Sequence, residues 1–212
     1  AVSSATVPTI TCTSSNVLPT ILQASAQMGP QLKILYGPDT YMGNNLERLL
    51  DVLSESWTDE QIQADLHPRH SRATLKALRD NLVVFPSGNC VVHHMFGHAV
   101  VDTVKEHYDD CYVTAHLEVP GEMFEIAMSK SLQDDGVVGS TSNILQFISR
   151  KVQERAEAGG AQGGRLRFIL GTEAGMVTSI VQSVQTILKN AGVDNLEAEV
   201  IFPVASEAVT ST

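Results

Sequence analysis

The amino-acid sequence predicts an α/β fold built from repeated three-layer lobes with mostly parallel sheets. Short apolar runs rich in Val and Ile alternate with longer stretches of helical period, which is typical of βαβ units around a parallel sheet. Similar Ser/Thr-rich turns open amphipathic helices at three places, which indicates duplicated lobes. The chain has 212 residues and is 43% hydrophobic, so it can bury a sizeable core.

Strands are expected where short runs of apolar and β-branched residues occur, because such residues suit a buried pleated surface. They cover residues 7–11, 32–36, 82–85, 111–115, 136–138, 166–170 and 198–202. Helices are expected where apolar residues recur three and four positions apart, which places them on one face. They cover residues 17–28, 44–53, 73–78, 99–107, 123–132, 144–156 and 176–189.

The segments between these elements predict the organisation of the chain. The polar stretch 54–72 is expected to hold a helix start at Thr58 and a break at His67, which precedes a proline. The glycine-rich run 159–164 predicts a surface turn between a helix and a strand.

Cys90 divides the predicted elements into two lobes, one over residues 1–90 and a second over residues 91–212. The second lobe is expected to be incomplete at its C-terminal end, because no helix pattern follows the last strand. The chain begins with Ala rather than Met, so its true beginning is expected to be missing.

Charge and hydropathy exclude several classes of protein. The formal net charge is −10 and no Lys/Arg patch is visible, which argues against a general nucleic-acid or anionic-membrane surface. No apolar run approaches the roughly 20 residues needed to cross a bilayer. Three scattered cysteines are too few for a disulfide framework, which favours a reducing compartment. Small molecules are therefore the expected partners.

Three Ser/Thr-rich turns are candidate ligand sites. Hydroxyls at a helix start cap free backbone N–H groups, and the same helix end attracts anions. Ligands of open α/β sheets bind at the carboxyl ends of the strands, where these turns are expected. A ligand held there would carry carboxylate or phosphate groups, whereas helix capping alone is the alternative explanation. The turns open the segments 13–18, 140–145 and 172–177.

A further turn is expected over residues 36–43, after the second predicted strand. Gly37 and Pro38 favour a tight turn, and Asp39 is its only candidate functional residue. A plain strand-to-helix connection explains the remaining residues.

Cys90 lies in the densest group of metal-binding residue types. It stands three residues before His93, and His94 and His98 follow four residues apart. On one helix, positions four apart share a face, so a zinc site of Cys90, His94 and His98 is conceivable. The alternative is a strand-to-helix turn with partly exposed histidines, in which the cysteine is an ordinary small core residue.

His116 and Glu118 follow another predicted strand. In an extended segment, residues two apart point the same way, so the imidazole and the carboxylate would face a common space. That pairing suits proton transfer, whereas a surface ion pair is the alternative.

Six segments, taken in order, resemble the signature segments of the quinolinate synthase family, and they span nearly the whole chain. They are Cys-Thr-Ser-Ser-Asn at 12–16, Tyr-Gly-Pro-Asp at 36–39, Cys-Val-Val-His at 90–93, His-Leu-Glu-Val-Pro at 116–120, Gly-Ser-Thr-Ser at 139–142 and Gly-Thr-Glu-Ala-Gly at 171–175.

The resemblance implies an enzyme that condenses iminoaspartate with dihydroxyacetone phosphate to quinolinate for NAD synthesis. It implies three α/β lobes in pseudo-threefold order around a [4Fe–4S] cluster, of which this chain would hold two. Each lobe would supply one cysteine, and the fourth iron position would act as a Lewis acid. A second copy of the chain and L-aspartate oxidase are the implied candidate protein partners.

The resemblance also implies roles for individual residues. Cys90 matches the middle cluster ligand, and His116 and Glu118 match a His-Pro-Glu triplet that contacts substrate and moves protons. Ser14, Ser140 and Thr141 would bind carboxylate or phosphate oxygens of the substrates.

The chain departs from the bacterial pattern at Val91, Leu117 and Val119, which stand where that pattern has Pro, Pro and Cys. The histidine-rich stretch after Cys90 and the insertion after Leu53 are similar to the plant and algal form. This form acts in plastids, with the cytoplasm as the alternative location.

Two cluster cysteines and a catalytic Tyr-x-Asn pair of the family lie outside the matched region, and neither Cys12 nor Cys111 matches a ligand position. The chain alone is therefore expected to hold an incomplete site. A non-catalytic module that binds a phosphorylated metabolite, and a zinc hydrolase, are the alternative functions.

Overall fold

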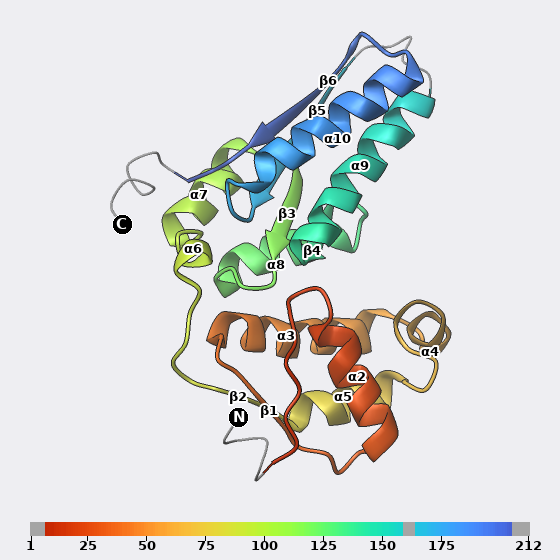
Figure 1. Cartoon of the computed structure of the whole chain (residues 1–212), viewed down its shortest axis with the longest axis vertical. Helices are drawn as coiled ribbons and strands as arrows, with labels where there is room; N and C mark the ends of the chain where they lie inside the picture. Colours follow the sequence, from red (N-terminus) through yellow and green to blue (C-terminus); the bar gives the residue numbers. More distant parts are fainter. Residues whose placement is uncertain (1–6, 159–163, 205–212) are drawn as a thin grey trace.

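The computed structural model describes residues 7–158 and 164–204, and Figure 1 shows the arrangement of their elements. The helices are α2 (Val17–Met28), α3 (Thr40–Ser56), α4 (Asp59–Gln61), α5 (Arg72–Asp80), α6 (Val91–His94), α7 (His98–His107), α8 (Gly121–Ser131), α9 (Thr141–Glu157) and α10 (Met176–Ala191), with one π-helical turn at Ile62–Leu66. The strands are β1 (Ile34–Tyr36), β2 (Leu82–Val84), β3 (Tyr112–His116), β4 (Gly136–Gly139), β5 (Gly164–Gly171) and β6 (Leu196–Ile201).

The larger sheet has the strand order β4-β3-β5-β6, and every pairing in it is parallel. Successive side chains of a strand point to opposite faces, and here both faces are covered. Val113, Ala115 and Ile169 belong to the core that contains α7 and α8. Phe168 and Leu170 belong to a second core that contains α9 and α10. The result is the expected three-layer arrangement of helices, sheet and helices.

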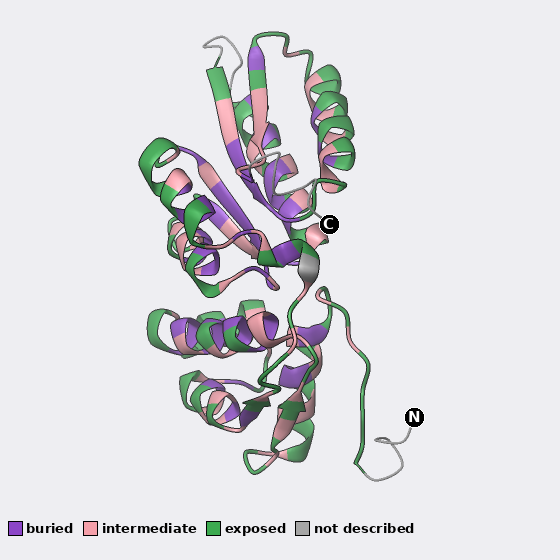
Figure 2. Cartoon of the chain, turned by 90° about the vertical axis from the view of Figure 1, so that its left-hand side faces the viewer, coloured by how far each residue is buried: buried purple, intermediate pink, exposed green. Residues whose placement is uncertain are grey.

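The smaller sheet consists of β1 and β2 alone, paired in parallel. Ile34, Tyr36 and Leu82 face the core formed with α2, α3 and α5. Leu35 and Val83, which pair with each other, point the other way and are 73% and 49% exposed. Figure 2 shows the contrast between this sheet and the larger one, in which most of β3 and the second half of β5 are buried.

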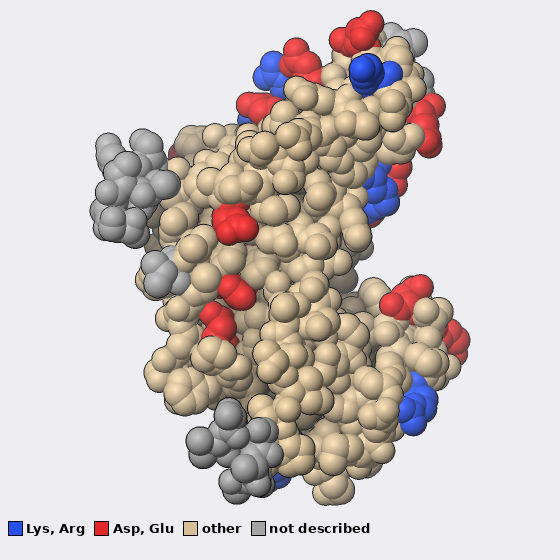
Figure 3. Space-filling view, in the orientation of Figure 1, with Lys and Arg blue, Asp and Glu red and all other residues tan. Residues whose placement is uncertain are grey.

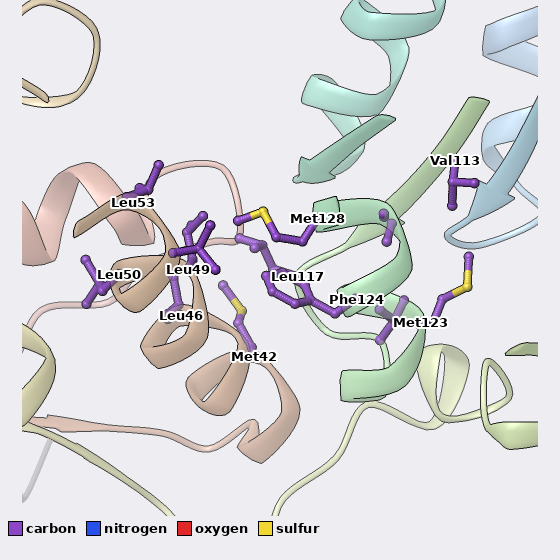
Figure 4. Close-up of a cluster of buried hydrophobic side chains, with 14 of the residues drawn as sticks. Met42, Leu46, Leu49, Leu50, Leu53, Val113, Leu117, Met123, Phe124 and Met128 are labelled. Carbon is purple, nitrogen blue, oxygen red and sulfur yellow. The ribbon is translucent and has the colours of Figure 1, made fainter. Parts of the chain in front are cut away.

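One hydrophobic core joins the two sheets' helices. Figure 4 shows Met42 and Leu49 of α3 opposite Leu117, together with Phe124 and Met128 of α8. We call residues 7–90 the N-terminal region and the described residues after Cys90 the C-terminal region. This core contains side chains from both sides of Cys90, so it does not separate the chain into two units there. The division into lobes at 1–90 and 91–212 stays a prediction.

Most predicted elements are present, with ends that differ by a few residues. Helix α2 covers the predicted range, and a capping box at Thr58 opens α4 as expected. The helical stretch ends at Leu66, just before His67, which confirms the predicted break. The fold class is confirmed, since all pairings in both sheets are parallel and helices alternate with strands.

The strand expected over residues 7–11 is wrong. This segment is extended without pairing, and Val7 and Ile10 are 51% and 68% exposed. A strand needs a neighbour to satisfy its backbone, and no described strand lies against this segment. The predicted turn at 159–164 falls outside the described residues except for Gly164, which begins β5.

Charged side chains of both signs lie next to one another at the end of the molecule formed by β5, β6 and α9 (Figure 3). Arg165 is paired there with Glu197, and Arg150 with Asp134. Among the described residues, no helix combines the length and the apolar character that crossing a membrane requires.

Candidate functional site

Cys90 lies in the loop that connects the two regions, as the residue before α6. Its backbone N–H donates to Asp39 Oδ2 over 2.8 Å. The other carboxylate oxygen, Asp39 Oδ1, accepts from the backbone N–H of Met42 over 2.6 Å and so caps α3. Asp39 therefore fixes the cysteine against the start of α3, and burial raises the pKa of this carboxyl group.

The loop before Cys90 is held against the α3 start by close backbone contact. Thr40 Oγ1 donates to the Phe85 carbonyl over 2.9 Å and accepts from the Gly88 N–H over 2.9 Å. A Cβ at position 88 would lie 2.0 Å from the Pro38 carbonyl oxygen, so only glycine fits there. The chain bends at Pro38, where a tight turn was predicted, and the peptide bond between Gly37 and Pro38 is cis.

His93 lies at the centre of the site and is 6% exposed. Its Nδ1 is 3.2 Å from Cys90 Sγ and 3.1 Å from Glu118 Oε2, and its Nε2 is 3.5 Å from Thr172 Oγ1. Its ring stacks on His116 with centroids 4.3 Å apart. One imidazole therefore joins α6, the end of β3 and the end of β5.

His116 and Glu118 occupy the end of β3 and the turn that follows it. The backbone N–H of Glu118 donates to His116 Nδ1 over 3.2 Å, which leaves Nε2 of the neutral ring to carry the proton. Burial, together with the neighbouring His93, lowers the pKa of His116 to about 4. The hydrogen bond from His93 lowers the pKa of Glu118. Near neutral pH the site thus pairs a neutral imidazole with a carboxylate.

The sheet register explains why Ser140 and Thr172 lie on either side of His116. His116 pairs with Gly139 of β4, and Ala115 pairs with Gly171 of β5. The residues that follow those glycines are Ser140 and Thr172, which are 2% and 0% exposed. The carboxyl ends of three neighbouring strands therefore bring Ser140 and Thr172 to the same edge of the sheet as His116.

The predicted Ser/Thr turns differ in what they do. Ser140 Oγ bonds to the Asn143 side chain in a capping box that opens α9, and half-buried Thr141 is the first residue of this helix. Ser14 is half-buried in a turn before α2, and among the described residues no hydrogen bond joins it to Cys90, His93 or Glu118.

Tyr36 ends β1, just before the turn that carries Asp39. Burial raises the pKa of its hydroxyl, and the nearby carboxylates of Asp39 and Glu118 and the Cys12 thiol raise it further. Cys12, two residues before Ser14, and Tyr36 both pack against the larger hydrophobic core.

The structure does not support the alternative zinc site of Cys90, His94 and His98. Helix α6 ends at His94 and α7 begins at His98, so the two histidines do not share a helix face. His94 stacks on Tyr41, and exposed His98 bonds to Glu122. Among the described residues, the group that could hold a metal ion is Cys90, His93 and Glu118, whose ligand atoms lie within 4.8 Å of one another.

Sequence reasoning left out His93 and Thr172 as site residues. The Cys-x-x-His spacing of Cys90 and His93 was the available signal, because positions three apart meet on one turn of helix. Thr172 occupies the same place after β5 as Ser140 does after β4, so the internal repeat pointed to it.

The donor set of this group fits part of a metal centre. A thiol, an imidazole and a carboxylate together suit a transition metal, and a cysteine thiolate is the ligand that iron–sulfur clusters use. Burial raises the pKa of the Cys90 thiol, and the Glu118 carboxylate adds to this effect. A bound cation would reverse that shift by stabilising the thiolate.

Comparison with known proteins agrees with this arrangement. A family described as quinolinate synthetase A protein matches residues 1–192. The chain is 52% identical over 206 residues to the chloroplastic quinolinate synthase of Arabidopsis thaliana, and 48% identical over 210 residues to that of Oryza sativa subsp. japonica. Each alignment covers 97% of this chain.

The quinolinate synthase of Haloarcula marismortui is a more distant relative, 26% identical over 140 residues, which are 66% of this chain and 33% of that protein. The chain spans only 28% of the Arabidopsis protein and 29% of the rice protein. Because the family match covers most of its length, the chain belongs to the quinolinate synthetase A family.

Proposed function

We propose that this chain forms part of a quinolinate synthase, which condenses iminoaspartate with dihydroxyacetone phosphate to quinolinate in NAD biosynthesis. The observation that carries the proposal is the convergence of Cys90, His93 and Glu118 where the two regions meet. The identity of about half of all positions to plant quinolinate synthases supports it.

Cys90 would supply one thiolate to a [4Fe–4S] cluster, and the other two cysteines would come from elsewhere in the full-length protein. Bound there, the cluster offers an iron with an open position that acts as a Lewis acid. Cys111 immediately precedes β3, at the opposite end of the strand from His116. It is 2% exposed, so we assign it to the core. We also assign no ligand role to Cys12.

His116 and Glu118 would contact substrate and move protons. A buried imidazole that stays neutral can donate a hydrogen bond from Nε2 without bringing a charge into the site. The Glu118 carboxylate, already ionised and held by His93, can accept a proton and return it. The two groups therefore differ in charge although they are two residues apart.

Ser14, Ser140 and Thr141 would bind carboxylate or phosphate oxygens of the substrates. Ser140 and Thr141 open α9, a helix of 17 residues whose N-terminal N–H groups favour negative charge. Ser14 would approach from the N-terminal region. These roles place substrate oxygens between the two regions.

The plant relatives are named chloroplastic, and we propose a plastid location for this protein on that basis. A homodimer and an association with L-aspartate oxidase, which would supply iminoaspartate, complete the proposal for its partners.

The decisive experiment compares Cys90→Ser with Cys12→Ser in the full-length protein purified without oxygen. We expect Cys90→Ser to abolish the iron and sulfide content, the visible absorbance of the cluster and quinolinate formation. Cys12→Ser is expected to keep all three. Equal loss in both variants, or stoichiometric zinc without iron in the wild type, would contradict the proposal.

A further inference from the structure

Asn45 of α3 reaches across the junction between the two regions. It is 2% exposed, and its Nδ2 donates to the carbonyl oxygens of Leu117 and Val119 over 2.9 and 2.8 Å. Both partners are carbonyls, which only accept, so the amide nitrogen must face them. The two carbonyls belong to the residues immediately before and after Glu118.

The turn around Glu118 has no other polar contact with the N-terminal region in the part of the chain that the structure describes, apart from its contacts at Cys90. The backbone N–H groups of this turn form hydrogen bonds within the C-terminal region. Leu117 N–H donates to the Gly139 carbonyl over 3.0 Å, and Val119 N–H donates to the His116 carbonyl over 3.2 Å. On its carbonyl side it is tied by Asn45.

These contacts are made where water is excluded. Leu117 and Val119 are 3% and 0% exposed, so a carbonyl that lost its donor there would stay unsatisfied or draw the turn away from its place. The first response destabilises the turn in its present place, and the second moves the backbone of Glu118. The carboxylate reaches His93 Nδ1 over only 3.1 Å, so a small displacement would break that contact.

We propose that Asn45 is a positioning residue that sets Glu118 against His93 and Cys90 by holding the two carbonyls that flank it. The proposal rests on the proposed function where it concerns catalysis, but its geometric content concerns only the Cys90, His93 and Glu118 group. Asn45 touches none of the ligand atoms, so it acts through the turn.

Arg48 provides a matched control on the same helix. Its Nε is 2.6 Å from Glu125 Oε1 of α8, so it also joins α3 to the C-terminal region. This ion pair is close to half exposed and does not touch the turn around Glu118. A general loosening of the junction would affect both positions, whereas positioning of Glu118 involves Asn45 alone.

The first test is metal binding, measured by titrating Co²⁺ into metal-free full-length protein and following the thiolate-to-cobalt absorbance. Asn45→Leu removes both donors at similar volume, and we expect it to raise the Kd by about 10- to 100-fold, as for other residues that orient ligands. Arg48→Met is expected to stay within about twofold. Equal Kd values for wild type and Asn45→Leu, or no Co²⁺ binding by the wild type, would overturn the proposal.

Asn45→Ser is the second variant if Asn45→Leu does not fold, since its short hydroxyl still suits a buried polar position. It is expected to weaken Co²⁺ binding in the same direction. Circular dichroism and the midpoint of thermal unfolding are recorded for each variant, so that only folded protein is compared.

The second test is a double-mutant cycle in the loaded holoenzyme. Asn45→Leu should lower kcat for quinolinate formation by about 10- to 100-fold in the wild-type background. In a Glu118→Gln background the same change should cost less than about twofold, because the group that it positions has been removed. Equal losses in both backgrounds would overturn the proposal. If Co²⁺ binding follows the prediction but the wild type makes no quinolinate, the proposed function fails and the positioning role stands.

Discussion

The two sheets of this molecule are built from similar residues but bury them very differently. In the larger sheet, Phe168, Ile169 and Leu170 of β5 are all fully buried, because helices cover both faces. In the smaller sheet, Leu35 of β1 is 73% exposed, whereas Leu82 of β2, which points to the other face, is 4% exposed. Parallel sheets are normally covered on both faces. The smaller sheet departs from this rule, because helices cover only one of its faces.

This difference determines what each region contributes to the site. The C-terminal region supplies His116, Ser140 and Thr172 from the ends of three packed strands. The N-terminal region supplies Asp39 and Asn45 from the start of α3. Its smaller sheet supplies none of the three residues that could hold a metal ion, Cys90, His93 and Glu118. A rigid sheet thus presents the hydroxyls and imidazole, and a helix start holds the cysteine and the Glu118 turn against it.

The largest expected effect tests burial by making the same change, Leu to Ala, once in each sheet. Leu170→Ala should lower the free energy of unfolding by about 2–5 kcal/mol, because it opens a cavity in a dry core. Leu35→Ala should change it by no more than about 0.5 kcal/mol. Urea unfolding followed by circular dichroism measures both. A similar cost at both positions would mean that the face bearing Leu35 is covered in solution.

A second prediction compares how firmly each sheet holds its neighbours. A Cβ at Gly171 would lie 2.3 Å from the Thr114 carbonyl oxygen, which is backbone of β3 and cannot give way. Gly171→Ala should therefore cost about 1–3 kcal/mol by forcing β5 away from β3.

Gly43 is the matched position in the N-terminal region. A Cβ there would lie 2.3 Å from Val84 Cγ1, which is a side-chain atom that can rotate. Gly43→Ala also gains about 0.5–1 kcal/mol of helix propensity, so its net cost should be smaller than that of Gly171→Ala. The same urea experiment decides, and the reverse order would show that the smaller sheet is the stiffer one.

The smallest expected effect concerns a surface charge pair in each region. Asp134 is bonded by Arg150 and Lys151, which lower the pKa of its carboxyl group. Because this side chain is 59% exposed, Asp134→Asn should cost no more than about 0.2–1 kcal/mol. Asn is the suitable replacement, because the backbone φ is +62° and Asn tolerates that region.

The sign of the pH dependence follows from the lowered pKa. The ion pairs of Asp134 stabilise the folded state above its ordinary pKa of 3.8, and this contribution is lost as the pH falls through the folded-state value. Asp51→Asn, which removes a partner of Arg79 in the N-terminal region, should have an effect of similar size. Urea unfolding in low salt measures the loss in the free energy of unfolding for each variant. If one loss is several times larger than the other, then the two regions differ in the strength of their charge pairs as well as in burial.

The sequence predicted helices better than strands for a physical reason. Apolar spacing in α2 and α10 records burial of one face, which depends mainly on local sequence. The segment 7–11 has the composition of a strand, but a strand exists only where a second one pairs with it. Composition cannot reveal that partner, so this prediction failed.

The site shows the same limit. The spacing of His116 and Glu118 indicated that they face one space, and the structure brings both to His93. The spacing of His94 and His98 misled, because the chain turns at Phe96, which is fully buried, before α7 begins. Asn45 gave no signal at all, since its partners lie 72 and 74 residues away.

The bond between His93 and Thr172 joins residues 79 positions apart, and this separation has a consequence during synthesis on the ribosome. At about 5–20 residues per second, roughly 4–16 s pass between the two residues. During that interval the nascent chain already displays Cys90 and His93, while β5 does not yet exist. A metal ion that arrived early would meet a thiol without its packed surroundings. The packed surroundings of Cys90 and His93 are therefore complete only after β5 has been synthesised.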